Sequence, residues 1–406
     1  MCARAPYTAG VSIRHPMSAD NFLHWTRQDG SPVSALWRSE SAMPVPKRVQ
    51  LVDDTLPADK AYKLACEGTG LLWAGDFQNA RHLLQALTRR LDKRSASPKQ
   101  GAGAPPDADA SAAGQAFHKH RQNLGHRARI LGMVLIPVNA DHTISLRRAP
   151  DLQQACIEAY GPGTQPYVTS LRELLGLIGA HEWRKKGVAV EALRGQGSGR
   201  IHAHYGVFSP VRGEYVDLVK HAPLPPDTHE AIDVGTGSGV LAAVLASRGI
   251  AHITATDQDA RALACAKENL QRLKLDAQVD VIEADLFPPG RAKLIVCNPP
   301  WLPARPSSPI EYAVYDPDSR MLRGFLSGLK AHLAPGGEGW LIMSDLAEHL
   351  GLRGVGELEG WIRDAGLRVI DRIDTRPHHP KARDANDPLH RARAAELTSL
   401  WRLAAE

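Results

Sequence analysis

Cysteine is scarce in this sequence, and the cysteines present are not spaced for a metal site or a disulfide framework. There are five among 406 residues, none forms a C-x-x-C pair, and the number is odd. Free thiols in a reducing cytosol are the simplest interpretation, which predicts a cytoplasmic protein. Two histidines share one segment, but no carboxylate or cysteine stands at ligand spacing from them. The sequence therefore predicts no metal site.

Long apolar runs are also missing. No stretch approaches the ~20 apolar residues that a membrane span requires, so no membrane partner is expected. The first 29 residues carry Arg4 and Arg14 but no continuous apolar segment, and a secretory signal is not expected. Hydrophobic residues nevertheless make up 43% of the chain, which is enough to build cores. The length suffices for two or three domains.

Positive charge is concentrated in the first half. Residues 1–205 carry 26 Lys and Arg against 17 Asp and Glu, a net charge of +9, whereas residues 206–406 carry 23 against 27, a net charge of −4. A basic half favours a polyanionic partner, with RNA as the first candidate. The alternative is a solvated half whose charge only maintains solubility. A basic cluster at 118–129 is expected either to contact phosphates or to form a solvated helix face.

Composition divides the chain into three parts. Residues 1–45 mix Pro, Ser and Arg without periodicity and are expected to be poorly ordered. Residues 46–204 are expected to form an N-terminal α+β domain for substrate recognition, interrupted by a low-complexity linker at 93–116. From 205 to 406 strand and helix patterns alternate, which predicts an α/β domain with a mainly parallel sheet and helices on both faces.

The most informative motif is the tetrapeptide Asn298-Pro299-Pro300-Trp301, which follows an apolar run at 293–297 that is typical of a buried strand. It is therefore expected where a parallel sheet presents its strand ends to ligands. An Asn carbonyl and a backbone carbonyl beside a rigid Pro-Pro pair can accept two hydrogen bonds from one planar NH₂ group. An aromatic ring next to them can lie against the plane of that amine. The alternative is a proline-rich loop capped by a core Trp.

A glycine-rich loop with the sequence Gly235-Thr236-Gly237-Ser238-Gly239 connects the first strand of this half to its first helix. Glycines permit a sharp turn and a close ligand, and the helix then offers free N–H groups. Asp257 ends the next predicted strand, 22 residues after Gly235, where a carboxylate can hold ribose hydroxyls. The loop and Asp257 alone fit either a dinucleotide or another adenosyl cofactor.

Two features separate these cofactors. The spacing here is G-x-G-x-G rather than the dinucleotide G-x-G-x-x-G, and Asp233 stands two residues before the first glycine. A carboxylate there would repel a pyrophosphate and would suit a cationic amino group. Asp285, at the end of the third strand, can accept the exocyclic amine of adenine, although an ordinary loop or N-cap acid is the alternative. Taken together in chain order, Asp233, the glycines, Asp257, Asp285 and the tetrapeptide favour an adenosyl cofactor that carries an amino group.

With these motifs in order, residues 205–406 resemble a class I S-adenosylmethionine-dependent methyltransferase of the amino-methylating group, whose hallmark is (Asn/Asp/Ser)-Pro-Pro-(Tyr/Phe/Trp). Segments 206–209 and 217–219 resemble the entry to the "small" methyltransferase domain of ribosomal RNA guanine-N2 and release-factor glutamine methyltransferases. The resemblance implies a Rossmann-like, mainly parallel seven-stranded sheet and S-adenosyl-L-methionine as cofactor. Trp301 departs from the usual Tyr or Phe, which leaves the size and shape of the acceptor open. Residues 1–204 resemble no family that we recognise.

The resemblance also implies roles for individual residues. The cofactor would be held by Asp233, Gly235, Thr236, Gly237, Gly239, Asp257, Gln258, Asp285, Leu286 and Asn298. In the catalytic clamp formed by the tetrapeptide, Asn298 and the Pro299 carbonyl would hold the target amine, and Trp301 would stack on it. Removing the Asn298 amide is expected to lower mainly the turnover.

The predicted reaction is methyl transfer to a planar amino group, in the first place an exocyclic base amine of rRNA or tRNA. The alternatives are a glutamine side chain in a release factor or ribosomal protein, a small-molecule amine, and an adenosyl-binding module without turnover. A basic segment at 376–383 and a proline-rich segment at 303–309 are candidates for substrate contact. Plain surface loops are the alternative for both.

Overall fold

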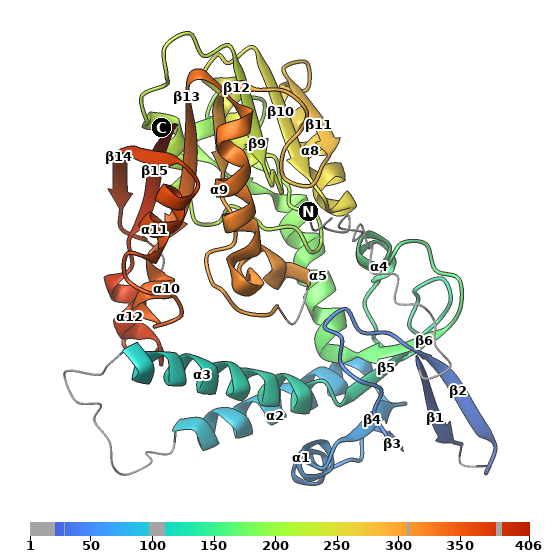
Figure 1. Ribbon diagram of the computed structural model, residues 1–406. Coiled ribbons are helices and arrows are strands. Elements are labelled where there is room, and N and C mark those ends of the chain that lie inside the picture. The colour runs from blue at the N-terminus through green and yellow to red at the C-terminus, as the bar shows by residue number, and fades with distance from the viewer. Residues whose placement is uncertain (1–20, 28, 97–109, 307–308, 379–383) are drawn as a thin grey trace, which may run out of the picture. The chain divides into compact units, whose positions relative to one another are not determined.

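The computed structural model describes residues 21–27, 29–96, 110–306, 309–378 and 384–406 (Figure 1). The chain forms two compact units. The first unit comprises the described residues from 21 to 185, and the second unit comprises 186–306 and 310–406. The expected boundary at 204/205 therefore lies about twenty residues too late. Residues of the segment 186–204, such as Leu193 and Ile201, are buried in the core of the second unit.

The second unit is built around a seven-stranded sheet. From one edge to the other its strands are β11 (Val279–Glu283), β10 (His252–Asp257), β9 (Glu230–Val234), β12 (Ala292–Cys297), β13 (Leu333–Ser344), β15 (Thr398–Ala405) and β14 (Leu367–Thr375). Neighbours from β11 to β13 are parallel, and β15 is antiparallel to both of its neighbours. The predicted mainly parallel seven-stranded sheet is confirmed.

Helices cover both faces of this sheet (Figure 1). They are α6 (Glu214–His221), α7 (Val240–Ser247), α8 (Ala260–Leu273), α9 (Arg320–His332) and α11 (Glu357–Asp364), with the short helices η2 (Glu191–Leu193), η3 (Pro309–Ala313), η4 (Pro317–Ser319), α10 (Leu346–His349) and α12 (His390–Ala395). Side chains of β12 alternate between the faces. Leu294 and Val296 pack with α6, α7 and α8, whereas Ile295 and Cys297 pack with α9 and α11. The apolar run Leu294–Cys297 of β12 is what two covered faces require.

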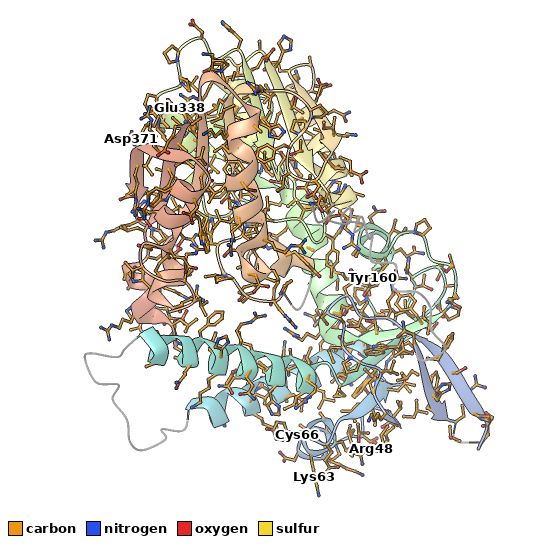
Figure 2. All side chains as sticks on the ribbon, viewed as in Figure 1. Arg48, Lys63, Cys66, Tyr160, Glu338 and Asp371 are labelled. Atoms are coloured by element: carbon orange, nitrogen blue, oxygen red, sulfur yellow. The ribbon has the colours of Figure 1, made fainter. Side chains whose placement is uncertain are left out.

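The antiparallel strand β15 is tied to its neighbours by a charged side chain. Arg402 of β15 donates from Nη2 to Glu338 of β13 at 2.8 Å and from Nη1 to Asp371 of β14 at 3.3 Å. Figure 2 labels the two acidic residues, Glu338 and Asp371. One guanidinium therefore joins the two strands that flank it. This contact helps to keep β13 in place, and the end of β13 lies beside the site described below.

The first unit contains a six-stranded mixed sheet. Its strands, in spatial order, are β1 (Phe22–Thr26), β2 (Pro32–Trp37), β6 (Tyr167–Ser170), β5 (Val134–Val138), β4 (Thr69–Trp73) and β3 (Arg48–Val52). Its helices are α1 (Ala58–Cys66), α2 (Phe77–Ala96), α3 (Ala110–Leu131), α4 (Gln153–Tyr160) and α5 (Leu171–Lys186), and the small strands β7 (Val188–Ala189) and β8 (Arg200–Ile201) follow. The mixed strand directions fit the expected α+β class.

Two expectations for the N-terminal region need correction. Strands β1 and β2 fall within residues 1–45, so the expectation of poor order is wrong for this part; Leu23 and Trp37 give it apolar side chains to bury. Residues 1–20 lie outside the described residues. Helices α2 and α3 also enter the expected linker at 93–116 from both sides, and 97–109 is not described.

Two further features of the described chain bear on its surroundings. Among the helices that the structure describes, none combines the length and the apolar character needed to cross a bilayer. Cys66, Cys156, Cys265 and Cys297 form no disulfide bond within the described residues, and Cys2 lies outside them.

Candidate functional site

The glycine loop follows β9 and turns sharply into α7. Gly235, Gly237 and Gly239 all have positive φ, at 72°, 54° and 80°. A side chain at Gly235 would collide with Met321, and one at Gly239 would stand 3.1 Å from the Cα atom of Ala266 in α8. By contrast, nothing lies within 4 Å of where a Cβ atom at Gly237 would be. The loop is thus packed at both ends and open in its middle.

Asp233 is buried directly beneath this loop. Its Oδ2 accepts hydrogen bonds from Thr236 Oγ1 at 2.7 Å and from the backbone N–H of Ala242 in α7 at 3.0 Å. Its Oδ1 is also buried and has no hydrogen-bond partner among the described residues. Burial raises the pKa of Asp233 to about 6. The carboxylate therefore fixes the loop with one oxygen and retains one buried acceptor for a donor from a ligand.

Asp257 ends β10, the strand beside β9, and reaches the same loop. Its Oδ2 accepts from the Gly237 N–H and its Oδ1 accepts from the Asp259 N–H, both at 3.0 Å. Burial raises the pKa of Asp257. The open middle of the loop and a partly buried carboxylate are thus next to each other, as a ribose-binding role requires.

The third strand end, after β11, is joined to β10 by two side-chain contacts. Gln258 Nε2 donates to Asp285 Oδ1, and Thr256 Oγ1 donates to the Leu286 carbonyl at 2.6 Å. Leu286 has a positive φ of 66°, and Asp285 is exposed. Three sequence-predicted residues, Gln258, Asp285 and Leu286, are therefore brought together at one edge of the sheet.

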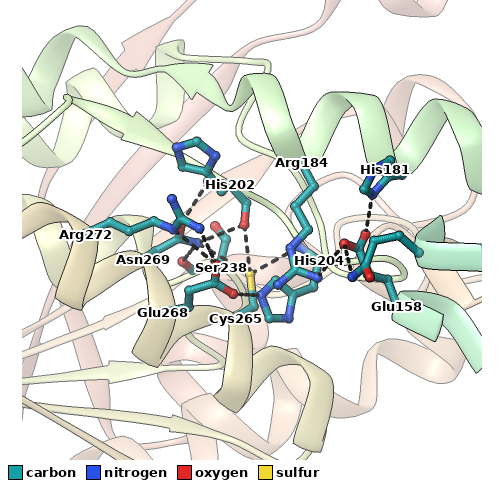
Figure 3. A network of polar contacts seen from close by, with 11 residues as sticks. Glu158, His181, Arg184, His202, His204, Ser238, Cys265, Glu268, Asn269 and Arg272 are labelled. Atoms are coloured by element: carbon teal, nitrogen blue, oxygen red, sulfur yellow. Dashed lines mark hydrogen bonds and ion pairs between the residues drawn. The ribbon is translucent and has the colours of Figure 1, made fainter. Parts of the chain in front are cut away.

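A buried amide that the sequence analysis missed secures the loop from behind. Asn269 of α8 donates from Nδ2 to the Ser238 carbonyl at 3.0 Å and accepts the His202 N–H at 2.8 Å (Figure 3). It is completely buried. No local signal marks this residue, because an Asn in an amphipathic helix is identified as a loop anchor only when its distant partners are known.

The tetrapeptide follows β12, at the same edge of the sheet as the glycine loop, because Cys297 pairs with Val234 in register. Pro299 is buried, and Asn298 and Trp301 are half-buried. Trp301 Nε1 donates to Asn298 Oδ1 at 2.9 Å, so one lone pair of the predicted amine acceptor is already used. The Trp301 ring packs against both core clusters of the sheet, as the core interpretation expects. Its stacking on an amine stays a prediction.

Charged side chains surround Trp301. The Cζ atom of Arg212 stands 5.2 Å from its ring centroid, within the range of a cation–π contact. Arg212 also donates to Glu214 at 2.8 Å and to Glu396 at 3.1 Å, and both carboxylates are buried. From another side, Arg353 Nη2 donates to the Trp301 carbonyl at 3.1 Å. Sequence reasoning identified none of these four charged residues.

The chain beyond the tetrapeptide returns to the same region. Asp316 N–H donates to the Leu302 carbonyl at 2.8 Å. The Asp316 carboxylate accepts the N–H of Met321 at 2.9 Å at the start of α9, and burial raises its pKa. The chain between Leu302 and Asp316 therefore starts and ends at two points that are held close together. The segment 303–309 belongs to it, and residues 307–308 are not described. Whether this segment covers an acceptor stays a prediction.

The other predicted substrate contacts belong to other segments of the chain. The basic cluster at 118–129 lies on α3 in the first unit. Of the segment 376–383, only 376–378 is described.

A pocket of about 280 Å³ lies between α6 and the end of β14, and its lining includes Glu214, Asp217 and Asp374. In the described ranges, no group of three or more His, Cys, Asp or Glu side chains is placed to hold a metal ion.

Comparison with known proteins finds a family match over this region. Residues 198–352 match the model of the methyltransferase small domain. A release factor glutamine methyltransferase of Cereibacter sphaeroides is 32% identical over 157 residues, which is 35% of this chain and 56% of the relative. A tRNA1(Val) (adenine(37)-N6)-methyltransferase of Glaesserella parasuis is 38% identical over 81 residues, which is 19% of this chain and 34% of the relative.

A ribosomal RNA small subunit methyltransferase C of Mannheimia succiniciproducens is 34% identical over 112 residues, which is 27% of this chain and 30% of the relative. The chain thus spans about half or less of the length of these curated relatives. The names of these relatives specify different substrates: a release factor, a tRNA and a ribosomal RNA.

Proposed function

Because residues 198–352 match the methyltransferase small domain, we propose that this chain is an S-adenosylmethionine-dependent N-methyltransferase that acts on a planar amino group. One observation carries the proposal: the ends of β11, β10, β9 and β12 bring the glycine loop, the acidic side chains and the Asn298 amide to one edge of the sheet. Ligands of open α/β sheets bind at this edge.

The residues present fit the proposed cofactor. Buried Asp233 has an unpartnered Oδ1 for a cationic amino group, and the space beside Gly237 is open. Asp257 would hold ribose hydroxyls, and Asp285 with the backbone of Leu286 would contact adenine. When bound, S-adenosyl-L-methionine supplies an electrophilic methyl group. A pyrophosphate would meet the Asp233 carboxylate, which disfavours a dinucleotide.

Catalysis by the protein would consist mainly of positioning. Asn298 Oδ1 and the Pro299 carbonyl accept the two N–H groups of the target amine, which aims its lone pair at the methyl group. The amine proton leaves after the new bond has formed, so the chain needs no base to remove it in advance. Correct placement of two reactants can supply ~7–11 kcal/mol of the barrier reduction.

We infer that the acceptor is an exocyclic base amine in RNA, because the first unit carries a strongly basic pair of helices. The sequences of α2 and α3 contain nine Lys and Arg, five in α2 and four in α3, against a single acidic residue, Asp92. Lys119 and Arg129 are exposed on α3, and Arg89 is exposed on α2. Such a surface suits the phosphates of a polyanion. An unpaired base is the expected target, since a paired amine is inaccessible.

A protein glutamine is the second candidate acceptor, and one observation favours it. The lining of the pocket between α6 and β14 includes three acidic side chains, of which Glu214 pairs with Arg212 and Asp374 pairs with Arg372. Acidic side chains suit the backbone N–H groups or cationic side chains of a peptide better than they suit phosphate. A glutamine carboxamide presents the same planar NH₂ group as a base. The clamp by itself accepts both substrates.

The test is methyl transfer from labelled cofactor to cell extract prepared from a strain that lacks the gene. For RNA as the acceptor, we expect the label to be released by nuclease and retained after protease treatment. Label released only by protease would identify a protein acceptor. Absence of transfer to any fraction, with a purified chain that binds S-adenosylhomocysteine, would overturn the proposed activity.

The substitution Asn298→Ala tests the clamp. We expect kcat to fall about 100-fold, comparable to the loss of one hydrogen-bonding group that acts on the reacting atoms. The affinity for S-adenosylhomocysteine, measured by calorimetry, should change much less, because most cofactor contacts come from β9, β10 and β11. An unchanged kcat would contradict the assignment of Asn298.

A further inference from the structure

We propose that Trp301 sets the orientation of the Asn298 amide and that Arg212 holds Trp301 in place, so that both act as positioning residues for the amine acceptor. The inference rests on the proposed function, because it concerns how the clamp presents an oxygen to the amine. It assigns to the indole N–H a task beyond ring stacking. The observations are the contacts of Trp301 with Asn298, Arg212 and Arg353.

The first step is the two-fold ambiguity of an amide side chain. A rotation of 180° about the last side-chain bond of Asn exchanges its carbonyl oxygen, an acceptor, with its NH₂ group, a donor. The target amine donates hydrogen bonds, so only one of these two orientations holds it. In the other orientation two NH₂ groups face each other and repel. A clamp that uses Asn therefore needs something to select the correct orientation.

The second step is that the indole makes this selection. The Nε1–H group of a Trp is a donor only, so its partner at 2.9 Å has to be the carbonyl oxygen of Asn298. The oxygen has two lone pairs, one for the indole and one for the target amine. A Phe ring at position 301 could stack but would donate nothing. The hydroxyl of a Tyr lies at the far end of its ring and would not reach the same atom in this geometry.

The third step is that the indole is itself fixed. Arg212 stands over the Trp301 ring and is held by the buried carboxylates of Glu214 and Glu396. Ser344, at the end of β13, donates to the same Glu396 oxygen at 2.8 Å. Arg353 holds the Trp301 carbonyl from another side. The ring therefore has little freedom to turn its N–H group away from Asn298.

The substitution Trp301→Phe tests the inference, because it keeps an aromatic ring and removes the indole N–H donor, together with some ring volume. We expect kcat to fall by about threefold to tenfold, the range for removal of one neutral hydrogen bond. The KM for the acceptor and the affinity for S-adenosylhomocysteine should stay within about twofold. The matched control is Trp401→Phe, a buried Trp of β15 whose ring is also stacked on an arginine, Arg372 at 4.5 Å. That control should leave kcat unchanged.

Three outcomes would overturn the inference. If Trp301→Phe is as active as the unaltered protein, the indole N–H does not orient the amide. If it is more active, the indole competes with the substrate for Asn298 and acts as a block. A loss of kcat in Trp401→Phe equal to that in Trp301→Phe would show a general effect of reduced core volume instead.

A spectroscopic readout separates this inference from the proposed function. The chain has eight Trp residues, and the indole ¹⁵N–¹H resonance of Trp301 is identified as the one missing from Trp301→Phe. We expect Asn298→Ala to move this resonance upfield, because the hydrogen bond is removed. A resonance that does not move would contradict the pairing, whether or not methyl transfer is ever detected. Conversely, a shift without methyl transfer to any acceptor would overturn the function and leave the pairing intact.

Arg212→Lys tests the support behind the ring. Lys keeps the charge between Glu214 and Glu396, so the fold should persist, but it lacks the planar guanidinium that stacks on the indole. We expect a fall in kcat of about twofold to fivefold and a broadened Trp301 indole resonance. When Trp301→Phe is added to Arg212→Lys, we do not expect the kcat of this double variant to be restored. Additive losses in that double variant would contradict a shared role for the two residues.

Discussion

At the scale of single residues, Asp233 has the most informative environment. Burial raises its pKa to about 6, while one of its oxygens lacks a partner among the described residues. A bound ammonium group favours the ionised carboxylate, so ligand binding should release a proton below this pKa. Acidification through pH 6 protonates Asp233 and removes the attraction. The affinity for S-adenosylhomocysteine should therefore be highest above pH 7 and about tenfold lower at pH 5.

Asp233→Asn is the matched variant for this prediction. Its carbonyl oxygen can still accept from Ala242 and Thr236, but the amide has no charge. We expect weaker binding at pH 7.5 and loss of the pH dependence, measured by calorimetry from pH 5 to 8. Asp257, whose pKa is also raised, remains intact in this variant. An unchanged pH profile would therefore assign the dependence to another group, such as Asp257.

Other residues of the candidate site show where sequence reasoning ends. Asp233, Asp257 and Asn298 were identified because each stands at a fixed position in a motif. Asn269 and Arg212 were not, because their roles depend on partners far away in sequence. Asn269 contacts Ser238 across 31 positions, and Arg212 contacts Glu396 across 184. Residues that support a motif from outside it are not visible until the fold brings them together.

At the scale of helices and strands, the alternation of strand and helix patterns was the most reliable signal. It made the order of all seven strands of the second sheet predictable, although β11 and β14 are largely exposed and only strands such as β12 and β13 contain buried apolar runs. Strands β1 and β2 were missed, because they lie within a segment rich in Pro, Ser and Arg. Helix α3 was expected only as a short basic segment, because few of its residues carry large apolar side chains. Tertiary packing decides such cases.

The glycine loop allows stability and ligand binding to be separated within one element. Gly239→Ala places a methyl group 3.1 Å from the Ala266 Cα atom at a φ of 80°, whereas Gly237→Ala meets nothing within 4 Å at a φ of 54°. We expect Gly237→Ala to lower the free energy of unfolding by about 1–2 kcal/mol, the cost of the left-handed backbone. Gly239→Ala should lower it by a further ~1–3 kcal/mol because of crowding.

Ligand binding should rank the two variants in the opposite order from stability, with Gly237→Ala the more impaired. The space beside Gly237 is where the cofactor is expected, so Gly237→Ala should weaken S-adenosylhomocysteine binding more than its modest effect on stability suggests. Urea unfolding and calorimetry on the two variants provide the comparison. Equal losses of stability in both variants would contradict the packing argument, and unimpaired binding by Gly237→Ala would place the cofactor elsewhere.

At the scale of the whole molecule, the chain joins two units of different charge. Residues 1–185, which contain the six-stranded sheet, carry 23 Lys and Arg against 16 Asp and Glu, a net charge of +7, whereas residues 186–406 carry 26 against 28, a net charge of −2. A unit with a net negative charge does not attract RNA by itself, so under the proposed function the basic unit on the same chain would supply most of the affinity for a polyanion. The charge difference was visible in the sequence. The helix pair α2 and α3, which gathers much of the positive charge, was not, because the expected linker divided it.

If the basic unit supplies the affinity for RNA and the other unit supplies catalysis, charge reversal on α3 should weaken RNA binding without changing turnover. In the double variant Lys119→Glu and Arg129→Glu, both exposed, we expect the KM for RNA to rise and kcat at saturating RNA to stay the same. The slope of log affinity against log salt should become shallower by about 0.7–0.9 for each phosphate that the variant no longer neutralises. The control is Lys60→Glu with Lys63→Glu on α1, which makes the same change in net charge. Both lysines are exposed, and Lys63 is labelled in Figure 2. If the control weakens RNA binding equally, net charge alone is responsible. If neither variant changes the salt slope, these helices do not contact RNA, and a protein acceptor becomes the better proposal.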